Sequence, residues 1–416
     1  MSRYGLLGDK LGHSFSKIIH EKLGFYSYDL LPMEKDELHE FLTKKDFDGV
    51  NVTIPYKLDV IPYCDEIDDT VAQIGSANTI VNRNGKLKAY NTDFYGFLYN
   101  MQFHHIAMKD KVVMILGSGG TCKTVTAVAK FQGAKEIVIV SRTESDTTIT
   151  YNQAKQREDV QVLVNASPSG MYPNNQNCPI DINCFPNLEA VVDVIYNPLK
   201  TKLLQQAQQR NIPFANGLLM LVAQAKFAAE LFIDEKIPDQ EIERIYQELK
   251  SDLSNVVLVG MPSCGKSTIG RELSKLLNKE FVDIDSLIEE EMKLAIPQIF
   301  ERYGEIGFRS IERNVVANAA KQTGMIVATG GGVVLNPDNI KDLKQNGIII
   351  LIDRSTDELL VGNNRPLSKS KQAIEEMYRN RYPIYMACSD IVVFNNGDIE
   401  RAVNDTNMQL KSHLGF

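Results

Sequence analysis

Short apolar segments rich in Val and Ile recur along the chain, and segments of helical periodicity separate them. This alternation is typical of strands that are buried on both faces and joined through helices. The sequence therefore predicts an α/β fold built on parallel sheets. The predicted strands are 112–116, 137–140, 160–164, 191–194, 256–259, 326–328 and 348–352.

The charged segment 234–253 is the predicted boundary between two domains. We expect it to form an exposed helix that is followed directly by the next predicted strand. A chain of 416 residues exceeds what one hydrophobic core usually organises. We therefore expect a first domain at 1–250 and a second at 251–416, with a separate subdomain beginning near Asp110.

Composition narrows the class of protein. Hydrophobic residues make up 44% and charged residues 24% of the chain, the balance of a soluble globular protein. The net charge of −8 argues against nucleic acid as the main partner, because no basic surplus is available to neutralise phosphates. No apolar segment approaches the roughly 20 residues of a membrane helix. The N-terminal residues lack the apolar core of a signal peptide, so we expect a cytoplasmic protein.

The cysteines and histidines show no metal-binding pattern. The six cysteines are scattered without a CxxC pair, and His104 and His105 have no third ligand nearby in the sequence. We expect free thiols in a reducing compartment and no structural zinc.

The segment 260–268, GMPSCGKST, follows the predicted strand 256–259 and precedes a helical pattern. This is the GxxxxGK[ST] phosphate-binding loop in the context that the loop requires. Its backbone N–H groups can surround phosphate oxygens, Lys266 can reach the β- and γ-phosphates, and Ser267 can ligate Mg²⁺. The motif predicts a nucleoside triphosphate ligand. We interpret Cys264 as a small packing residue rather than a redox switch.

A second glycine-rich turn follows the predicted strand 112–116. Its sequence GSGGT, residues 117–121, is a GxGG variant of the dinucleotide-binding turn, although a tight turn without a ligand is an equal alternative. NAD sites usually carry an acidic residue at the end of the next strand. This chain carries Ser141, Arg142 and Thr143 there, which suits a 2′-phosphate and favours NADP(H). Arg142 could also be a solvated charge.

Three further patterns follow the phosphate-binding loop. We expect 281–285 to be a strand that places Asp283 and Asp285 on one face, toward the phosphates and the acceptor. Arg309 and Glu312 are neighbours on a helix face, where the glutamate can orient the guanidinium toward a carboxylate. An exposed ion pair is the alternative. Three glycines at 330–332 end a predicted strand and allow a ligand to approach the backbone closely.

Six polar motifs occur in order within the first 250 residues, at 14–16, 51–57, 76–79, 91–93, 193–198 and 216–225. Together they resemble shikimate dehydrogenase over residues 3–250. The resemblance implies a substrate-binding α/β part at 1–105 and 217–250 and a Rossmann-like part at 106–216. It also implies reversible reduction of 3-dehydroshikimate to shikimate by NADPH, without a metal.

The resemblance to shikimate dehydrogenase assigns roles to residues. Lys57 and Asp93 are the implied catalytic pair, because an ammonium can stabilise and protonate the alkoxide that hydride transfer builds. The implied substrate-binding residues are Ser14, Ser16, Thr53, Lys57, Asn78, Asp93, Tyr196 and Gln224. The implied NADP-binding residues are Gly117, Ser118, Gly119, Gly120, Thr121, Ser141, Arg142, Thr143 and Gly217.

The motifs of the second domain resemble shikimate kinase over residues 254–412, which implies a P-loop domain with a parallel sheet that phosphorylates shikimate with MgATP. The implied catalytic residues are Lys266, Asp285 and Arg365, the last from a closing lid. The implied ATP-binding residues are Ser263, Cys264, Gly265, Lys266, Ser267, Thr268 and Arg365. Asp285, Arg309, Gly331 and Arg381 are implied to bind shikimate, and Ser267 and Asp283 to support Mg²⁺.

The chain departs from both families in places. The segment 144–159 is short, and Glu144, Ser145 and Asp146 directly follow Thr143, where the family commonly has a second basic residue within a few positions. Both departures weaken the assignment of the 2′-phosphate site. The segment 358–363 lacks an arginine that shikimate kinases commonly carry, and 368–371 is short. The two resemblances name consecutive reactions, so we expect a bifunctional enzyme. The alternatives are a quinate or polyol dehydrogenase joined to another small-molecule kinase, or a regulatory ligand-binding protein with one inactive domain.

Overall fold

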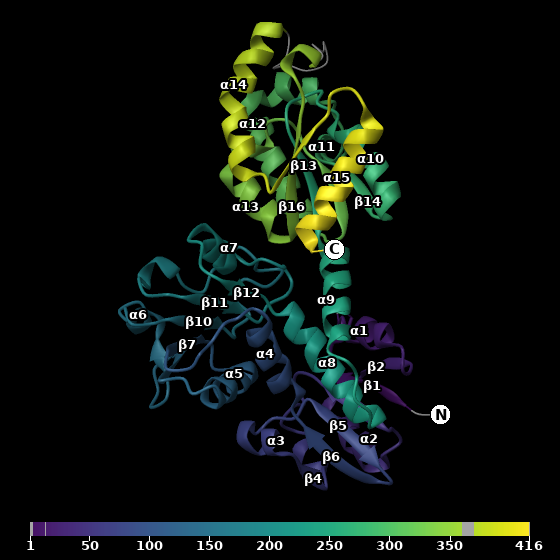
Figure 1. The fold of residues 1–416 in the computed structure, drawn as a ribbon, viewed down its shortest axis with the longest axis vertical. Coiled ribbons are helices and arrows are strands. Elements are labelled where there is room, and N and C mark those ends of the chain that lie inside the picture. Colours follow the sequence, from purple (N-terminus) through teal and green to yellow (C-terminus); the bar gives the residue numbers. More distant parts are fainter. Residues whose placement is uncertain (1–2, 13, 360–369, 416) are drawn as a thin grey trace. The chain divides into compact units, whose positions relative to one another are not determined.

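The protein is described by a computed structural model of residues 3–12, 14–359 and 370–415. The chain divides into two compact units. The first comprises 1–197 and 201–246, and the second comprises 198–200 and 247–416. Each unit is an α/β structure with helices packed around its sheets (Figure 1), so the predicted fold class is confirmed.

The first unit begins with a six-stranded mixed sheet in the order β2-β1-β3-β5-β6-β4. β1, β2 and β3 are parallel, whereas β5 runs antiparallel to β3 and β6. A two-residue Asn84-Gly85 turn joins β5 to β6, and both residues have the positive φ that such a hairpin turn requires. The strands are β1 (Tyr4–Gly8), β2 (Tyr28–Pro32), β3 (Gly49–Val52), β4 (Glu66–Ile67), β5 (Thr79–Arg83) and β6 (Lys86–Tyr90). The helices are α1 (Ser16–Leu23), α2 (Lys35–Lys44), the 3₁₀ turn η1 (Ile61–Tyr63), α3 (Asp69–Ile74) and α4 (Thr92–Phe103).

The second sheet of this unit is parallel throughout, in the order β12-β11-β10-β7-β8-β9. Successive residues of its central strand β7 enter two different cores, because strand side chains alternate between faces. The strands are β7 (Val112–Leu116), β8 (Glu136–Ser141), β9 (Ile149–Thr150), β10 (Val162–Asn165), β11 (Ala190–Asp193) and β12 (Phe214–Ala215). The helices are α5 (Gly120–Phe131), α6 (Tyr151–Ala154), the 3₁₀ turn η2 (Ile182–Cys184) and α7 (Lys202–Gln209).

The strand order places β7 where the chain direction across the second sheet reverses. β8 and β9 continue on one side of β7, and β10 to β12 on the other. In open α/β sheets, ligands bind outside the carboxyl ends of the strands at such a switch point. The glycine-rich turn 117–121 leaves β7 at this position.

Helix α8 (Leu218–Ile233) returns from the second sheet and packs on α4 and α1. It is followed by α9 (Gln240–Leu253), which contains the boundary between the two units at 246/247. The prediction that this segment is an exposed helix is wrong in one respect. The side chains of Ile242 and Ile245 are fully buried, and the ring of Tyr246 lies 6.1 Å from that of Phe103. The many charged residues of this segment obscured apolar residues that recur at helical spacing.

The second unit holds a five-stranded parallel sheet in the order β14-β15-β13-β16-β17. Its strands are β13 (Asn255–Val259), β14 (Glu280–Asp283), β15 (Met325–Ala328), β16 (Gly347–Asp353) and β17 (Ile391–Phe394). Its helices are α10 (Lys266–Leu277), α11 (Ile284–Met292), α12 (Ile296–Ala319), the 3₁₀ turn η3 (Val333–Leu335), α13 (Pro337–Asn346), the 3₁₀ turn η4 (Thr356–Glu358), α14 (Lys371–Cys388) and α15 (Ile399–Leu414). All seven strands predicted from apolar segments are present.

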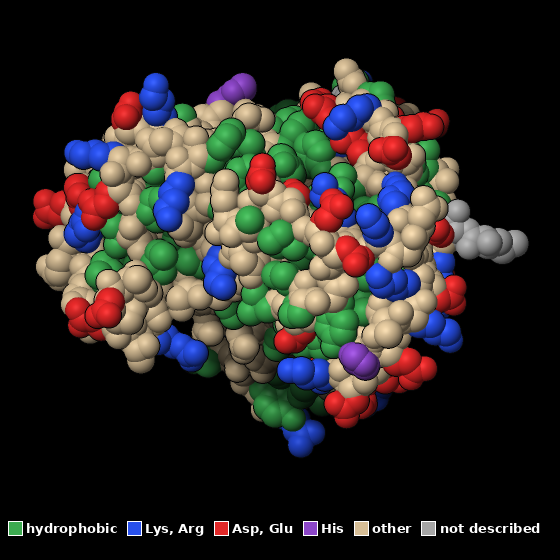
Figure 2. Space-filling model, turned by 90° about the horizontal axis from the view of Figure 1, so that it is seen from below, with side chains coloured by type: hydrophobic (Ala, Val, Ile, Leu, Met, Phe, Trp, Pro, Cys, Tyr) green, Lys and Arg blue, Asp and Glu red, His purple; other side chains and the backbone are tan. Residues whose placement is uncertain are grey.

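The surface carries many charged side chains of both signs (Figure 2), in agreement with the 24% of charged residues in the chain. On the face drawn in Figure 2, basic and acidic side chains are interspersed rather than separated into large areas of one sign. None of the helices within the described ranges combines the length and the apolar character that crossing a bilayer would take.

Candidate active sites

A cavity of about 330 Å³ lies in the first unit beside the mixed sheet. Its walls come from segments far apart in the sequence, including the loop after β1, the end of β3, the start of α4 and helix α8. The structure brings together all eight residues that the resemblance implied for substrate binding: Ser14, Ser16, Thr53, Lys57, Asn78, Asp93, Tyr196 and Gln224.

Lys57 and Asp93 form an ion pair in the wall of this cavity. The ammonium donates a hydrogen bond of 2.6 Å to Asp93 Oδ2, and the side chains are 26% and 18% exposed. Asp93 lies in the first turn of α4, whose N-terminus is capped by Asn91 through a bond from Phe94 N. The cap fixes the first turn of α4 and with it the position of the Asp93 carboxylate. This carboxylate orients the Lys57 ammonium, which can donate a proton into the cavity.

Side-chain amides form another part of the wall. Thr92 N donates to Asn78 Oδ1 over 2.7 Å, and Asn78 Nδ2 donates to Thr92 Oγ1 over 3.0 Å. Gln224 approaches the same amide at 3.4 Å. Asn51 also lines the cavity, and its Oδ1 accepts a bond of 2.7 Å from the buried hydroxyl of Tyr28. These partners hold the amides in fixed directions, as recognition of several hydroxyl groups requires.

Ser14, Ser16 and Tyr196 contribute hydroxyl groups to the wall of the cavity. Ser16 begins α1, and its backbone N–H donates to Ser14 Oγ over 3.2 Å, so the two serines share one turn. The ring of Tyr196 lies 5.8 Å from that of Phe15. Burial raises the pKa of the Tyr196 phenol, which therefore stays protonated and able to donate at neutral pH.

The turn 117–121 is positioned as a dinucleotide site. Gly117 has φ 101° and its N–H donates to Val140 O over 2.8 Å, so the end of β8 lies beside the turn. Gly119 and Gly120 at the start of α5 have open space where a side chain would be, which leaves the helix N-terminus accessible. Ser141 ends β8, and Arg142 and Thr143 are exposed directly after it.

Gly217 has a local structural role. A side chain there would collide with the carbonyl oxygen of Val194, and the Gly217 N–H donates to Ile195 O over 3.0 Å. The glycine therefore lets the start of α8 approach the end of β11. Asp193 at that strand end is fully buried and accepts bonds from Ile195 N, Asn165 Nδ2 and Thr201 Oγ1.

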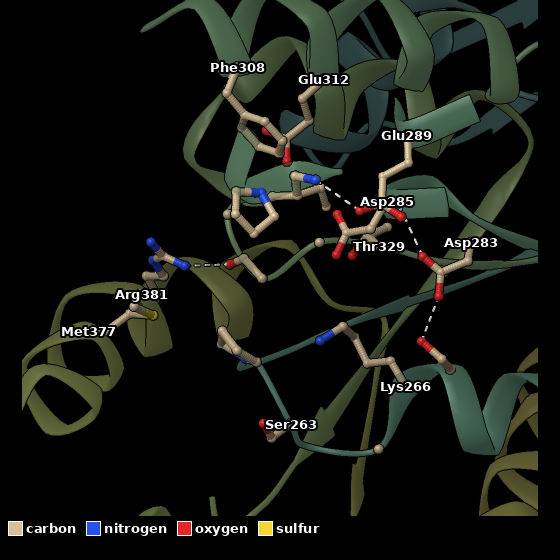
Figure 3. A pocket seen from close by; sticks show the side chains of 18 of the residues that line it. Ser263, Lys266, Asp283, Asp285, Glu289, Phe308, Glu312, Thr329, Met377 and Arg381 are labelled. Carbon is tan, nitrogen blue, oxygen red and sulfur yellow. Dashed lines mark hydrogen bonds between the residues drawn. The ribbon is translucent and has the colours of Figure 1, made fainter. Parts of the chain in front are cut away.

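A larger cavity of about 800 Å³ lies in the second unit, around the loop after β13 (Figure 3). The sequence-implied residues that line it are Ser263, Gly265, Lys266, Ser267, Thr268, Asp283, Asp285, Arg309, Gly331 and Arg381. Cys264 is fully buried behind the loop and does not line the cavity, in keeping with a packing role. Arg365 lies outside the described residues.

The phosphate-binding loop has the backbone that its function requires. Ser263 and Gly265 adopt positive φ values of 67° and 104°, which aims successive N–H groups into one concave surface. The Lys266 ammonium donates to the carbonyls of Gly260 and Met261 over 3.0 and 2.9 Å. Both partners are neutral, so the positive charge of Lys266 remains available for a phosphate.

Asp283 and Asp285 do not share a strand, which corrects the sequence prediction. β14 ends at Asp283, which caps α11 by accepting a bond of 3.0 Å from Asp285 N. Asp285 thus lies in the first helical turn, and both carboxylates still face the cavity (Figure 3). The Ser267 hydroxyl donates to Asp283 Oδ2 over 2.6 Å.

The oxygens of Ser267 and Asp283 suit Mg²⁺, which is usually held by one or two protein oxygens together with phosphates and water. Clusters of three or more His, Cys, Asp or Glu side chains able to hold a metal do not occur in the described part of the chain.

Arg309 and Glu312 form the predicted pair on α12, with bonds of 2.8 and 3.0 Å from one guanidinium nitrogen to both carboxylate oxygens. Glu312 is almost fully buried, and burial raises the pKa of its carboxyl although Arg309 acts in the opposite direction. On α14, Arg381 donates to Gly331 O over 3.0 Å. Both guanidinium groups line the cavity, where they can meet an anionic acceptor.

Each of the glycines 330–332 has a different neighbour. A side chain at Gly330 would come within 2.6 Å of Asp285 Oδ1, and one at Gly331 within 2.8 Å of the Pro262 ring. At Gly332 it would collide with the guanidinium of Arg309. The absence of side chains at 330–332 thus lets Asp285, the phosphate-binding loop and Arg309 pack against one backbone segment.

Several residues that line the two cavities are not among those that the resemblances implied. Glu289 and Phe308 are two of them (Figure 3). Glu289 accepts a bond of 2.8 Å from Ile296 N, and the ring of Phe308 stacks on that of Phe300 at 4.5 Å. Arg354, Met377 and Ile399 also line this cavity, as Lys10 and Asn51 line the smaller one. Asn51 could have been inferred, since it precedes Thr53 by the two residues that separate same-face positions on a strand.

Comparison with known proteins agrees with this geometry. Residues 6–80 match the family model described as the shikimate dehydrogenase substrate binding domain, and residues 262–410 match that of shikimate kinase. A shikimate dehydrogenase (NADP(+)) of Clostridium beijerinckii is 34% identical over 270 residues, which cover 61% of this chain and 99% of the relative.

Solved structures resemble the first part of the chain. A chorismate mutase/shikimate 5-dehydrogenase fusion protein from Clostridium acetobutylicum gives a TM-score of 0.57 at 32% identity, covering 60% of this chain and 97% of that one. Shikimate 5-dehydrogenase from Thermus thermophilus, solved with NADP(H) and shikimate, gives 0.54 at 26% identity, covering 60% and 99%. The chain therefore belongs to the shikimate dehydrogenase family through its N-terminal part, to which a shikimate kinase domain is joined in the C-terminal part.

Proposed function

We propose that this chain is a bifunctional enzyme of the shikimate pathway, which reduces 3-dehydroshikimate to shikimate with NADPH and phosphorylates shikimate at the expense of ATP. The observation that carries the proposal is the coexistence of two sets of side chains, each suited to one of the two reactions. The Lys57–Asp93 pair lies in a cavity of amides and hydroxyls, and Lys266 and Asp285 lie together in a phosphate-binding cavity.

In the reduction, NADPH supplies a hydride to the C3 carbonyl carbon of the substrate. The ammonium of Lys57 stabilises the developing alkoxide and transfers a proton to that oxygen, which completes the hydroxyl. Asp93 keeps the ammonium directed at the reacting oxygen, and the resulting neutral amine regains its proton from solvent. Ser14 and Ser16 donate to the substrate carboxylate, and the amides of Asn78 and Gln224 recognise its hydroxyl groups.

We assign the cofactor of the reduction as NADP(H). The exposed cation Arg142 and the hydroxyls of Ser141 and Thr143 lie at the end of β8, beside the turn that would hold the pyrophosphate. No acidic side chain occupies 141–143, where it would repel a 2′-phosphate.

In the phosphorylation, Asp285 accepts the proton of the acceptor hydroxyl as that oxygen attacks the γ-phosphorus of ATP. The bond from this phosphorus to the bridging β–γ oxygen breaks, and ADP leaves. Lys266 stabilises negative charge on the transferred group. When bound with the nucleotide, Mg²⁺ would supply further positive charge at the phosphates. Arg309 and Arg381 hold the acceptor carboxylate. Ser267 and Asp283 would support the metal, and we retain Arg365 as the expected cation from the lid.

A coupled assay tests both activities at once. The purified chain is incubated with 3-dehydroshikimate, NADPH and MgATP, and the products are followed by NADPH absorbance and mass spectrometry. We expect shikimate without ATP and shikimate 3-phosphate with it. Quinate and 3-dehydroquinate serve as competing substrates. Faster turnover of these would support the polyol alternative, and loss of one activity in the wild-type chain would support a regulatory domain.

A further inference from the structure

The cavity of the second unit has two sides that are defined by the order of its strands. The phosphate-binding loop leaves the central strand β13, with β15 and β14 on one side and β16 and β17 on the other. Asp285 and the glycines 330–332 follow β14 and β15, whereas Arg354 and Ile399 follow β16 and β17. All of these residues line one cavity.

The loop is anchored on the β16–β17 side. A side chain at Gly260 would collide with the carbonyl oxygen of Ile352, so the first residue of the loop lies directly against the end of β16. Asn395, just after β17, donates from Nδ2 to Cys264 O over 2.8 Å and from its backbone N–H to Asp353 O over 2.8 Å. Phosphates held by the loop therefore have the ends of β16 and β17 as their immediate neighbours.

A nucleoside triphosphate in this loop has only one productive direction. Its γ-phosphate must face the acceptor, which the positions of Asp285 and Arg309 place on the β14–β15 side. The nucleoside must extend the opposite way. It then enters the part of the cavity that Arg354 and Ile399 line.

Arg354 has the geometry of a stacking residue. Its Nε donates to Glu358 Oε2 over 3.1 Å, and its backbone N–H donates to Asp353 Oδ1 over 2.9 Å. The bond to Glu358 restrains the plane of the guanidinium, and at 22% exposure part of the side chain's surface stays open. A guanidinium plane stacks well on an aromatic ring, which a compact ammonium does not. The apolar side chain of Ile399 offers a second surface for a base.

We propose that Arg354 binds the base of ATP by stacking on it, with Ile399 contributing apolar contact, and thereby sets nucleotide affinity in the kinase half. This inference rests on the proposed kinase function. A residue that stacks on the base differs from one that contacts the phosphates. Its substitution should not change the binding of a phosphate chain that carries no base.

Calorimetric titration of the full chain tests the inference without any acceptor. The titrants are a non-hydrolysable ATP analogue with Mg²⁺ and inorganic tripolyphosphate with Mg²⁺, both in saturating NADP⁺ to occupy the dinucleotide site. We expect Arg354→Ala to weaken binding of the ATP analogue about tenfold and to leave tripolyphosphate within about twofold. Arg354→Lys should resemble Arg354→Ala, since the charge is kept and the plane is lost.

Arg401→Ala is the matched control, because Arg401 follows Ile399 closely on α15 but does not line the cavity. Unchanged tripolyphosphate binding also shows that the variant domain is folded. Equal weakening of both titrants, full affinity in Arg354→Lys, or no effect in Arg354→Ala would each overturn the inference. If the wild-type chain binds the ATP analogue but does not phosphorylate shikimate, the proposed function fails while the titration still decides the role of Arg354.

Discussion

Lys57 is the residue whose chemistry is most directly testable. Its ammonium is held by a single carboxylate at 2.6 Å and faces a cavity lined with hydrogen-bonding groups. We expect Lys57→Met to lower the dehydrogenase kcat by about 10²- to 10⁴-fold, because the alkoxide loses its proton donor. Kinase activity should be unchanged. Lys17→Met removes an exposed ammonium from α1 and is the control; a Lys57 variant that keeps more than about a tenth of the wild-type kcat would contradict the role.

Asp193 is a buried acid whose charge should make the first unit sensitive to pH. Burial raises the pKa of its carboxyl from 3.8 to about 7, against the three hydrogen bonds that favour the charged form. Between these values the folded chain binds a proton that the unfolded chain has released. The free energy of unfolding therefore falls as the pH rises through this window, by at most about 1.4 kcal/mol per pH unit from this one group.

Asp193→Asn should remove that dependence, since an amide of the same shape carries no charge. We expect the variant to gain stability relative to the wild type as the pH rises from 5 to 8, with the two most alike at pH 5. The urea concentration that halves dehydrogenase activity at each pH measures this. Parallel curves for the two proteins across the range would show that Asp193 does not titrate there.

At the scale of an element, α8 is held by a buried ion network. The Lys226 ammonium contacts Glu230 at 2.6 Å and Asp239 at 2.9 Å, and the Lys226 and Glu230 side chains are 4% and 6% exposed. Glu230 also accepts from Ile237 N over 2.9 Å. Since α8 carries Gln224 into the cavity of the first unit, the network links the stability of the helix to the position of a residue that the proposed function assigns to substrate binding.

Glu230→Gln should destabilise the first unit by about 2 to 3 kcal/mol, because it removes one partner from a buried charge. Urea unfolding of the full chain, followed by dehydrogenase activity, measures the change. Glu241→Gln breaks a more exposed pair with Arg244 on α9 and should cost below about 1 kcal/mol. Equal effects of the two substitutions would mean that burial does not strengthen the Lys226 network.

Most strands of the two parallel sheets could be predicted from sequence because each is a short apolar run with clear ends, but β9, β12 and β17 were not predicted. The error at Asp285 arose at a transition from strand to helix, which periodicity does not locate. A signal was present, since an Asp before acidic residues in a first helical turn is typical of an N-cap. The apolar stripe of α9, with Ile242 and Ile245, could likewise have been predicted from its spacing, but the surrounding charged residues favoured an exposed helix.

Other parts of the sites were beyond sequence reasoning. The pairing of Lys57 with Asp93 follows from the resemblance, but its 2.6 Å geometry depends on where α4 begins relative to β3. Phe300, Arg354 and Ile399 enter one cavity from helices and loops distant along the chain. Only the order of strands in the sheet brings such residues together, and that order is a property of the whole domain.

At the scale of the whole molecule, α9 crosses the boundary between the two units. A cut at the predicted boundary of 250 would divide this helix. Within the second unit, the Lys279 ammonium donates to the carbonyls of Ser251, Asp252 and Ser254 over 2.8 to 3.1 Å. The end of α9 is thus part of the structure that supports the kinase sheet.

Separate halves should be active if α9 is kept whole in each. We expect 1–253 to retain dehydrogenase activity and 240–416 to retain kinase activity, both within a few-fold of the full chain. A kinase fragment that begins at 255 should melt about 5 °C lower or more than 240–416, because Lys279 loses three acceptors. Differential scanning calorimetry compares the two fragments, and equal melting temperatures would contradict the supporting role of the helix end.

The glycines at 330–332 bear on how the kinase half would respond to antimicrobial selection. An inhibitor that gains its affinity from the backbone of this stretch contacts three positions where a side chain would displace Asp285, Pro262 or Arg309. Resistance commonly arises when a substitution obstructs the drug and spares the substrate. Here the obstructing substitutions would also disturb Asp285, the phosphate-binding loop or Arg309, to which the proposed function assigns the phosphorylation reaction. A substitution at these positions would therefore inactivate the enzyme at the same time as it excludes the inhibitor.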